Sequence, residues 1–361
     1  MRTKSLVSTV AKTIFLSIAL AAAPTASFSG DLAVAATTSA SASTGGQLDA
    51  VRARGQLACG VGSRVVGFAH ATSQGGLRGL EVDLCRAVAA AIFGDVEKAK
   101  FVPVNAARQF SVLQSGEVDV LSSMTTPTLT RRMPFEADFV GVHYYDRQGF
   151  MVLRDSDIRR VKDLDGRSLC VERGTAAEVD IVDYFLARKL AFKLAVMDTP
   201  EDVSTAFLAG RCEVMAAGLS HLYATRLLHA PNPNDYRILA HTAAVASLGP
   251  AVRHGDNRLA GLVRWAIYAT IEAEELGITS RNVDKMLNSE SQAIRRFLGV
   301  TPGLGTALGV QDKWAYHVVK QVGNYGESYD RNVGARTALQ IPRGLNMLSS
   351  QGGMMYAPSI R

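Results

Sequence analysis

The chain has 361 residues, of which 47% are hydrophobic and 20% charged, and its formal net charge is +6. This composition excludes an intrinsically disordered protein, and the length is sufficient for two domains that each have a hydrophobic core. The weak positive charge is not gathered in one basic cluster. Nucleic acid is therefore not an expected partner, because binding it requires several phosphate contacts from one surface.

The N-terminal segment, residues 1–36, has the pattern of a secretory signal peptide with its leader. Three basic residues, Arg2, Lys4 and Lys12, precede an apolar run over residues 13–23, and small residues follow. This run is shorter than the roughly 20 apolar residues that a membrane-spanning helix needs. We expect cleavage between residues 26 and 36, and with Asp31 retained the loss of the three basic residues lowers the net charge from +6 to +3.

Strand and helix patterns alternate over the next part of the chain. Residues 37–47 are rich in Ser, Thr, Ala and Gly and are expected to form a flexible leader. The patterns then predict strands over 56–61, 101–104 and 118–123 and helices over 80–93 and 108–114. They continue with strands over 167–171, 192–197, 213–217 and 236–241 and helices over 176–188, 200–210 and 219–229. This alternation predicts βαβ units, and hence an α/β fold with mostly parallel sheets.

The C-terminal part of the chain is expected to be helical. Helices are predicted over 259–273 and 282–288. Further helices follow from about residue 314, and they are interrupted by Gly323, Gly326 and Gly334. Glycine favours such breaks because it lacks the Cβ atom that restricts the backbone.

One short motif occurs twice. Residues 113–120 and residues 208–215 both indicate a helix end, a glycine and then a buried strand, with the glycine three residues before an acidic residue. A glycine just past a helix adopts the left-handed conformation that ends it without steric cost. The two copies predict two lobes of similar build. On an exported chain, two such lobes predict a cleft that captures a small molecule.

Two segments, 144–149 and 244–249, are placed so that they can cross between these lobes. With both as hinges, lobe 1 is discontinuous and combines residues 48–143 with residues 250–361. Lobe 2 then consists of residues 150–243. Paired crossings favour hinge closure around a ligand.

The four cysteines are Cys59, Cys85, Cys170 and Cys212, an even number in a chain expected to enter an oxidising compartment. Three pairings are open from the sequence alone, and buried free thiols are a further alternative. We favour Cys59–Cys85 and Cys170–Cys212, because each bond then lies within one lobe. No Cys-x-x-Cys or His-rich spacing indicates a metal site, and we expect no cofactor.

Motifs of catalysis are weak in this chain. The glycines of segment 60–67 lack the spacing of a dinucleotide-binding loop, and Ser220-His221 lacks the glycine-flanked elbow of a hydrolase. Glu81 and Asp83 lie in the first turn of a predicted helix, where the helix dipole accounts for acidic residues. We therefore assign no catalytic residue.

Two segments favour anion binding. Thr126, Thr128 and Arg131 follow a predicted strand, where ligands of open α/β sheets bind, and an arginine there can pair with a carboxylate. Gly174 and Thr175 precede a predicted helix, whose free backbone N–H groups can face an anion. The two segments have equivalent places in the two lobes, so closure is expected to bring them together.

Four longer stretches carry a resemblance to a known family. They are GLEVDLCRAVAAAIFGD over 79–95, LGPAVR over 248–253, VGNYGE over 322–327 and YAP over 356–358. With them the chain resembles periplasmic solute-binding proteins of polar amino-acid ABC transporters, solute-binding protein family 3, in particular the larger general L-amino-acid-binding type. The last two stretches match the C-terminal extension that distinguishes this larger type.

The resemblance implies a type II periplasmic-binding-protein fold with two closing lobes and a helical C-terminal extension. It implies a non-enzymatic, monomeric protein of the periplasm that binds an amino acid or another small carboxylate. The ligand would be delivered to an ABC permease in the inner membrane. The resemblance also supports the cysteine pairing that we favour.

In that family an arginine of a Thr-x-Thr-x-x-Arg stretch binds the ligand's α-carboxylate, and Arg131 matches it, with Thr126 and Thr128 nearby. The Gly-Thr turn of lobe 2 assists the same carboxylate, and Gly174 and Thr175 match that turn.

Two positions depart from the family pattern. Gly218 stands where an aspartate usually binds the ligand's ammonium group, and Arg64 stands near the cleft where a small residue is usual. A buried ammonium without its counter-charge costs about 3–5 kcal/mol, or two to four powers of ten in affinity. We therefore expect weak binding of ordinary α-amino acids, or a preference for an anion without an ammonium, with Arg131 and Arg64 as anchors.

Two alternatives remain open from the sequence. One is a periplasmic enzyme on the same fold, similar to a cyclohexadienyl dehydratase, which needs a carboxylic acid in the cleft as a proton donor. Glu172 and Glu178 are the candidates for that acid. The other is a ligand-incompetent pair of lobes that serves as a sensor or partner module.

Overall fold

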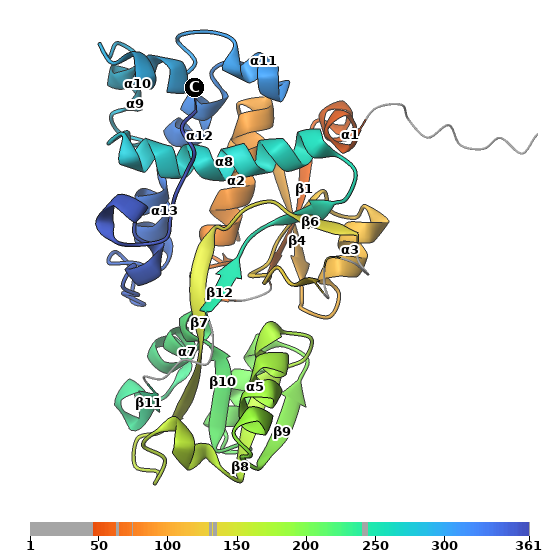
Figure 1. The fold of residues 1–361 in the computed structure, drawn as a ribbon, viewed down its shortest axis with the longest axis vertical. Helices are drawn as coiled ribbons and strands as arrows, with labels where there is room; N and C mark the ends of the chain where they lie inside the picture. Colours follow the sequence, from red (N-terminus) through yellow and green to blue (C-terminus); the bar gives the residue numbers. More distant parts are fainter. Residues whose placement is uncertain are drawn as a thin grey trace, which may run out of the picture. The chain divides into compact units, whose positions relative to one another are not determined.

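The computed structural model describes residues 46–62, 65–73, 75–129, 132, 136–239 and 245–360 (Figure 1). All of them belong to one compact unit, Gly45–Arg361, which is built around two large sheets. Sheet I contains, in spatial order, β4 (Ala99–Val104), β1 (Leu57–Gly62), β5 (Val120–Ser122), β13 (Ala251–Arg253) and β6 (Ala137–Phe139). Sheet II contains β11 (Tyr236–Ile238), β7 (Tyr144–Leu153), β10 (Val214–Gly218), β8 (Arg167–Glu172) and β9 (Phe192–Met197), and β12 (Val245–Leu248) pairs with β7.

Helices cover both sheets, and each sheet with its helices is called a lobe here (Figure 1). Lobe 1, around sheet I, contains α1 (Gln47–Arg54), α2 (Leu80–Phe93), α3 (Gln109–Ser115), α8 (Asn257–Glu275), α9 (Val283–Met286), α10 (Gln292–Phe297), α11 (Leu304–Leu308), α12 (Trp314–Val322) and α13 (Tyr325–Asn332). It also carries a small hairpin of β2 (His70–Ala71) and β3 (Leu77–Arg78). Lobe 2, around sheet II, contains α5 (Ala176–Ala187), α6 (Pro200–Leu208) and α7 (Leu219–Ala224).

Sheet II is covered on both faces, which explains the continuous apolar runs at the centre of its strands β7, β8 and β10. Side chains alternate along a strand, so Phe150 packs with Ile181 and Phe185 on one face. Met151 packs with Phe207 in a separate cluster on the other face. Sheets covered by helices on both faces give continuous hydrophobic runs rather than alternating ones, and the strands of this sheet follow that rule.

The pairing of the strands is parallel at the centre of each sheet. β1 pairs in parallel with β4 and β5, and β8 pairs in parallel with β9 and β10. Antiparallel strands complete both sheets, since β13 pairs with β5 and β6, and β7 pairs with β10 and β11. The parallel pairs join β1, β4, β5, β8, β9 and β10, which were all predicted from the βαβ pattern, whereas the predicted strand β11 pairs antiparallel with β7.

The chain passes from sheet I to sheet II at β7 and returns at β12 (Figure 1). The first part of β7, Tyr144–Arg147, pairs with β12, and the following residues pair with β10 and β11. One continuous strand therefore belongs to both the connection and the sheet of lobe 2.

The repeated motif has the same conformation in both lobes. Gly116 ends α3 with a φ of +79°, and Gly210 follows α6 with a φ of +72°. Both values lie in the left-handed region, which a side chain would disfavour.

The acidic residue of each motif forms a two-point clasp on the neighbouring strand. The backbone N–H of Asp119 donates to the carbonyl of Ala58 at 2.8 Å, and Asp119 Oδ2 accepts from the N–H of Ala58 at 2.8 Å. In lobe 2 the N–H of Glu213 donates to the carbonyl of Ser168 at 3.1 Å, and Glu213 Oε2 accepts from the Ser168 N–H at 3.1 Å. The motif is repeated because both lobes fix the same strand register at the start of a strand.

Two disulfides link elements within the lobes. Cys59 of β1 bonds to Cys85 of α2, and Cys170 of β8 bonds to Cys212, which precedes β10. The favoured pairing is confirmed.

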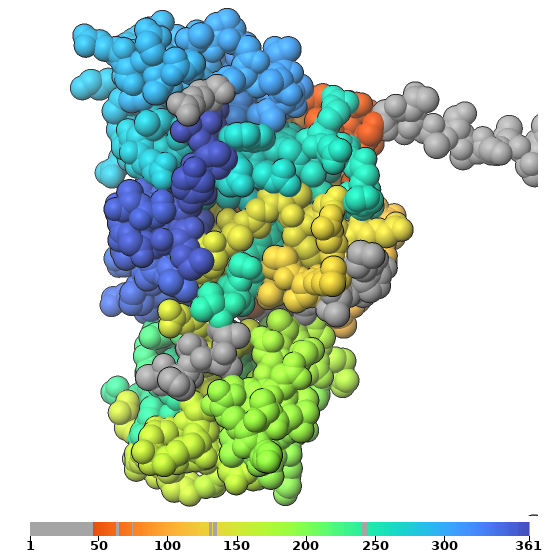
Figure 2. Space-filling model, in the orientation of Figure 1, coloured from red at the N-terminus to blue at the C-terminus, as the bar shows by residue number. Residues whose placement is uncertain are grey.

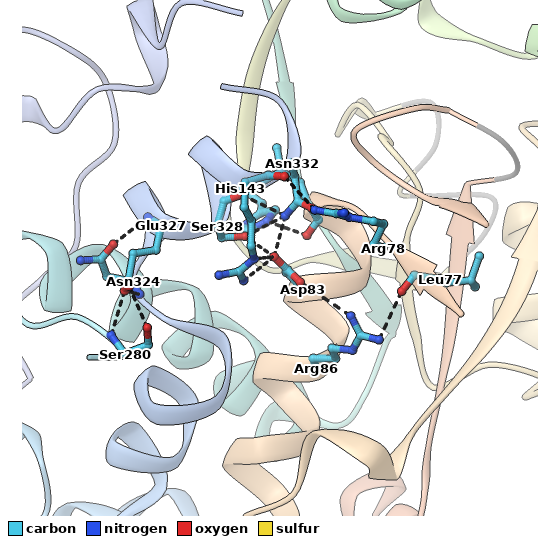
Figure 3. A network of polar contacts seen from close by, with 12 residues as sticks. Leu77, Arg78, Asp83, Arg86, His143, Ser280, Asn324, Glu327, Ser328 and Asn332 are labelled. Carbon is cyan, nitrogen blue, oxygen red and sulfur yellow. Dashed lines mark hydrogen bonds and ion pairs between the residues drawn. The ribbon is translucent and has the colours of Figure 1, made fainter. Parts of the chain in front are cut away.

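The C-terminal helices pack against lobe 1, and the C-terminal segment lies over that lobe on the face shown in Figure 2. Asp83 of α2 is the centre of this contact (Figure 3). Asp83 Oδ2 accepts from Ser328 Oγ at 2.6 Å, from Arg331 Nε at 3.0 Å and from Asn332 Nδ2 at 2.6 Å. The helix dipole was therefore an incomplete explanation for Asp83, which anchors α13 on α2.

The same segment supports the strand that joins the lobes. Asn346 Oδ1 accepts from the N–H of Tyr145 at 2.7 Å, and Asn346 Nδ2 donates to the carbonyl of Tyr145 at 2.9 Å. The hydroxyl of Tyr325 donates to the carbonyl of His143 at 3.0 Å. The buried side-chain amide of Asn346 thus pairs with the backbone N–H and carbonyl of Tyr145, on the side of β7 that faces no other strand.

Several elements differ from the sequence prediction. Helix α2 and strand β9 have the predicted bounds, but α9 is shorter than the predicted 282–288, because its short pattern resembles a turn. The sequence patterns also missed β6, β13 and the strand character of β7 and β12. The predicted signal peptide, residues 1–36, and most of the leader lie outside the described residues.

The two clasps differ in burial, which gives a matched pair of variants. The Asp119 side chain is 3% exposed. Asp119→Ala therefore leaves the Ala58 N–H without an acceptor inside the protein, and Arg54 loses its ion-pair partner. We expect a loss of about 2–3 kcal/mol in the free energy of unfolding by urea titration. Glu213→Ala should cost less than about 1 kcal/mol, because the Glu213 side chain is 47% exposed. Equal losses would contradict the clasp as a burial-dependent interaction.

Candidate functional site

A cavity of about 140 Å³ is lined by residues of both lobes. Lobe 1 contributes residues that follow β1, β4 and β5, together with α3: Gly62, Val65, Val104, Asn105, Ala106, Gln109, Ser123, Met124, Thr125 and Thr126. Lobe 2 contributes residues that follow β8 and β10 and the start of α6: Glu172, Thr175, Ala176, Ala177, Pro200, Val203, Ala216, Ala217, Gly218, Ser220 and His221. The connecting strands add Asp146, Gln148, Ala246 and Leu248. The cavity thus lies at the carboxyl ends of parallel strands in both sheets, where α/β folds bind ligands.

The predicted site residues are partly brought together. Thr126, Thr175 and Gly218 line the cavity. Gly174 lies beside it, and a Cβ atom at this position would stand 3.8 Å from the backbone of Ala106 in the other lobe. Thr128 lines a different hollow on the surface of lobe 1.

Two predicted ligand-binding residues, Arg64 and Arg131, lie outside the described residues. Among the described residues, the cavity lining contains the carboxylates of Asp146 and Glu172 and no lysine or arginine.

A hydroxyl network orders the lobe 1 wall. Gln109 Oε1 accepts from Ser123 Oγ at 2.7 Å and from Thr125 Oγ1 at 2.6 Å. Gln109 Nε2 donates to the carbonyl of Ala106 at 3.0 Å. One side chain of α3 therefore fixes the segment after β4 and the segment after β5, and the latter leads to Thr126.

The second wall contains a capped turn. Thr175 caps α5, because its Oγ1 accepts from the N–H of Glu178 at 3.3 Å. The N–H of Gly174 donates to Glu178 Oε2 at 2.7 Å. These two N–H groups, expected from the sequence to be free for an anion, are already paired within the turn. Their acceptors stabilise the helix start instead.

Glu172 reaches across the cavity from lobe 2 to lobe 1. Its carboxyl accepts a hydrogen bond from the backbone N–H of Ala106. Burial raises the pKa of Glu172 to about 7, against the smaller opposing effect of that hydrogen bond. The group therefore changes charge near neutral pH.

Asp146 lies beside Gly218, the position at which the resemblance implied a missing counter-charge. Asp146 is 5% exposed, and its Oδ2 accepts from Ser220 Oγ at 2.6 Å. Its Oδ1 accepts from the N–H of Arg147 at 2.8 Å. A Cβ atom at Gly218 would stand 2.4 Å from Asp146 Oδ2. The site therefore contains a carboxylate beside Gly218, and it comes from β7 rather than from the end of β10.

Two further polar side chains face the cavity. His221 Nε2 lies 3.1 Å from Ser204 Oγ, and burial lowers the pKa of His221 to about 4, so the imidazole is neutral at pH 7. Gln148 is 8% exposed, and its Oε1 has no hydrogen-bond partner among the described residues. The cavity thus offers an unpaired acceptor in addition to its charged groups.

The sequence interpretation missed Gln109, Asp146 and Gln148 as site residues. A signal was present for the last two, because polar residues two positions apart interrupt the predicted crossing segment and must share one face if it is extended. Gln109 gave no such signal, since its role depends on contacts with residues that follow another strand.

The described part of the chain contains no cluster of three or more His, Cys, Asp or Glu side chains with metal-binding geometry. None of its helices combines the length and the apolar character that a membrane span requires.

The raised pKa of Glu172 predicts a pH-dependent stability. A carboxyl whose folded-state pKa is raised stabilises the fold below its ordinary pKa of 4.5, and this contribution is lost as the pH rises through about 7. Glu172→Gln imitates the protonated group at every pH. We expect the variant to gain about 1–3 kcal/mol in the free energy of unfolding over wild type between pH 5 and pH 8. A difference that does not change with pH would contradict a titrating Glu172.

Comparison with known proteins identifies the family. Residues 57–282 match the bacterial extracellular solute-binding proteins, family 3. The general L-amino acid-binding periplasmic protein AapJ of Rhizobium johnstonii is 44% identical over 324 residues, which cover 89% of this chain and 95% of AapJ. The glutamate/glutamine/aspartate/asparagine-binding protein BztA of Rhodobacter capsulatus is 40% identical over 335 residues, covering 92% and 98% of the two chains.

A solved structure matches over the same length. The ABC transporter/periplasmic binding protein from Brucella ovis with glutathione bound has a TM-score of 0.85 and 42% identity, and the match covers 88% of this chain and all of that one. The two-lobed fold agrees with the family expected from the sequence. This chain belongs to the bacterial extracellular solute-binding proteins of family 3.

Proposed function

We propose that this protein is the substrate-binding component of an ABC importer, and that it captures an amino acid or a related small carboxylate between its lobes. The observation that carries the proposal is the cavity at the carboxyl ends of strands in both sheets. AapJ and BztA are named as amino-acid-binding proteins, and each is at least 40% identical to this chain. At about 140 Å³, the cavity is smaller than the pockets of about 300 Å³ and above that hold drug-sized ligands. A cavity of this size suits a small solute.

Arg131 is the proposed partner of the ligand carboxylate. The segment that leads to it follows β5, and Thr126 of this segment lines the cavity. Thr175 lines the opposite wall and is held in place as the cap of α5. A guanidinium forms paired, charge-assisted hydrogen bonds with a carboxylate. We assign Thr128, Gly174 and Arg64 to the same ligand-binding site, with roles secondary to that of Arg131.

The proposed mechanism is closure about the two strands that join the lobes. Segments 144–149 and 244–249 act as hinges, and they contain the paired parts of β7 and β12. The bond from the Ala106 N–H to Glu172 joins the two walls of the cavity. A contact of this kind exists only when the lobes approach each other, so it stabilises the closed state.

The wider setting follows from the same proposal. Relatives in the family are periplasmic or extracellular binding proteins. We infer that residues 1–36 are a signal peptide and that the mature protein is a periplasmic monomer. It would deliver its ligand to an ABC permease in the inner membrane and catalyse no reaction.

One observation favours a second candidate, an enzyme similar to a cyclohexadienyl dehydratase. Glu172 lines the cavity with a pKa near 7, which suits a proton donor. The other candidate acid, Glu178, already accepts a hydrogen bond from the N–H of Gly174. Turnover of prephenate by wild type, lost in Glu172→Gln, would establish the enzyme and overturn the binding-only role.

Ligand-induced stabilisation tests the binding function. A panel of L-amino acids and dicarboxylates is added to the purified mature protein, and the melting temperature is measured. We expect at least one L-amino acid to raise it, because a ligand at 100 times its Kd stabilises the native state by about 2.7 kcal/mol. Arg131→Ala should lower the affinity for that ligand, measured by calorimetry, by about 100-fold or more.

The control is Arg132→Ala, since the Arg132 side chain is 60% exposed and pairs with Asp138 at 3.4 Å outside the cavity. This variant should bind like wild type. No stabilisation by any member of the panel, in a protein that unfolds cooperatively, would refute the proposed function.

A further inference from the structure

The cavity contains a buried carboxylate without a cation to neutralise it. Asp146 is 5% exposed, and its hydrogen bonds come from Ser220 Oγ and from the N–H groups of Arg147, Leu219 and Ser220. No described lysine or arginine forms an ion pair with it. These hydrogen bonds offset part of the cost of burying the charge but do not neutralise it, so a cationic group of a ligand is a favourable partner.

A second group at the same place is an unpaired acceptor. Gln148 is 8% exposed, it lines the cavity, and its Oε1 accepts no hydrogen bond from the described residues. Asp146 and Gln148 are two positions apart on β7, so their side chains lie on one face of the strand. A buried acceptor without a donor costs about 1–3 kcal/mol, and a ligand that donates to it removes this cost.

Gly218 makes room for this pair of side chains. It lies directly opposite Gln148 in the register of β10 and β7. A Cβ atom at Gly218 would stand 2.4 Å from Asp146 Oδ2, so the carboxylate occupies space that a larger residue would need. A side chain at 218 and the present position of Asp146 therefore exclude each other.

We propose that Asp146 and Gln148 form the subsite for the ammonium group of the ligand, with Asp146 supplying the charge and Gln148 Oε1 the free acceptor. The inference rests on the proposed function and defines its substrate class as solutes with both a carboxylate and an ammonium. Burial raises the pKa of Asp146 to about 6, which leaves the group ionised at pH 7. The N–H donors at the start of α7 fix its orientation, so the charge is in place before the ligand arrives.

Matched ligands that differ by the ammonium group test the subsite. L-glutamate is compared with glutarate, and L-alanine with propionate, by calorimetry at pH 7.5. We expect wild type to bind the ammonium-bearing member of at least one pair about 100-fold more tightly. Asp146→Asn should remove most of that preference and leave the affinity for the ammonium-free member nearly unchanged. Gln148→Leu should reduce the preference by about tenfold.

An exchange of positions gives a gain-of-function arm. Gly218→Asp alone should bind poorly, because its carboxylate collides with Asp146 and repels it. Asp146→Gly combined with Gly218→Asp should recover at least tenfold of the preference lost in Asp146→Gly, since the charge returns from the opposite strand. Asp155→Asn, an exposed site in lobe 2, is the control and should bind like wild type.

The outcomes separate this inference from the proposed function. Binding of all four ligands without preference for the ammonium would overturn the subsite and leave the function intact, and this comparison needs no variant. Loss of the preference in Glu172→Gln but not in Asp146→Asn would assign the ammonium to Glu172 and also overturn it. No binding of these four ligands, together with no stabilisation by the wider panel, would refute the function itself.

Discussion

The structure depends on the hydrogen-bonded pairing of one strand, β7. Its first residues pair with β12, its later residues pair with β10 and β11, and Asn346 binds the backbone of Tyr145 on the remaining side. Every backbone group that is paired in this way is fixed in direction, so the side chains of Asp146 and Gln148 are presented to the cavity at a set angle. The C-terminal extension, anchored by Asp83, therefore supports the strand that carries Asp146 and Gln148, although none of its described residues lines the cavity.

The cavity contains partly desolvated carboxylates, whose desolvation cost a ligand of opposite charge can offset. Two carboxylates line the cavity, Asp146 buried and Glu172 half-buried, and burial raises their pKa values to about 6 for Asp146 and about 7 for Glu172. Backbone N–H groups stabilise both charges. In the proposed site, a solute with a positive group at Asp146 and a negative group at the segment after β5 is favoured at both ends. The proposed specificity then depends on the positions of charges rather than on a close apolar fit.

Much of the fold was predictable because its signals are local. The bounds of α2 follow from its apolar content and from Gly94, which ends it in the left-handed conformation. The cap of α6 follows from Thr199 and Pro200. The strands β6 and β13 were missed because three-residue strands carry too little pattern, and they form only where partners from distant parts of the chain are already present. The site shows the same limit, since Thr126 and Thr175 follow strands, whereas Gln109 acts through residues that become neighbours on folding.

The sequence by itself determined the two-lobe plan, the family and the edge of each sheet at which the site lies. Each of these depends on periodicity, on glycine positions or on extended stretches of identity, which are local in the chain. The tertiary structure alone decided that a carboxylate of β7, that of Asp146, lies beside Gly218 in the cavity. Gly218 and Asp146 are far apart in sequence, and their competition for one volume arises from the antiparallel register of β10 and β7. Such a register is set by side-chain packing across the sheet, and no single segment encodes it.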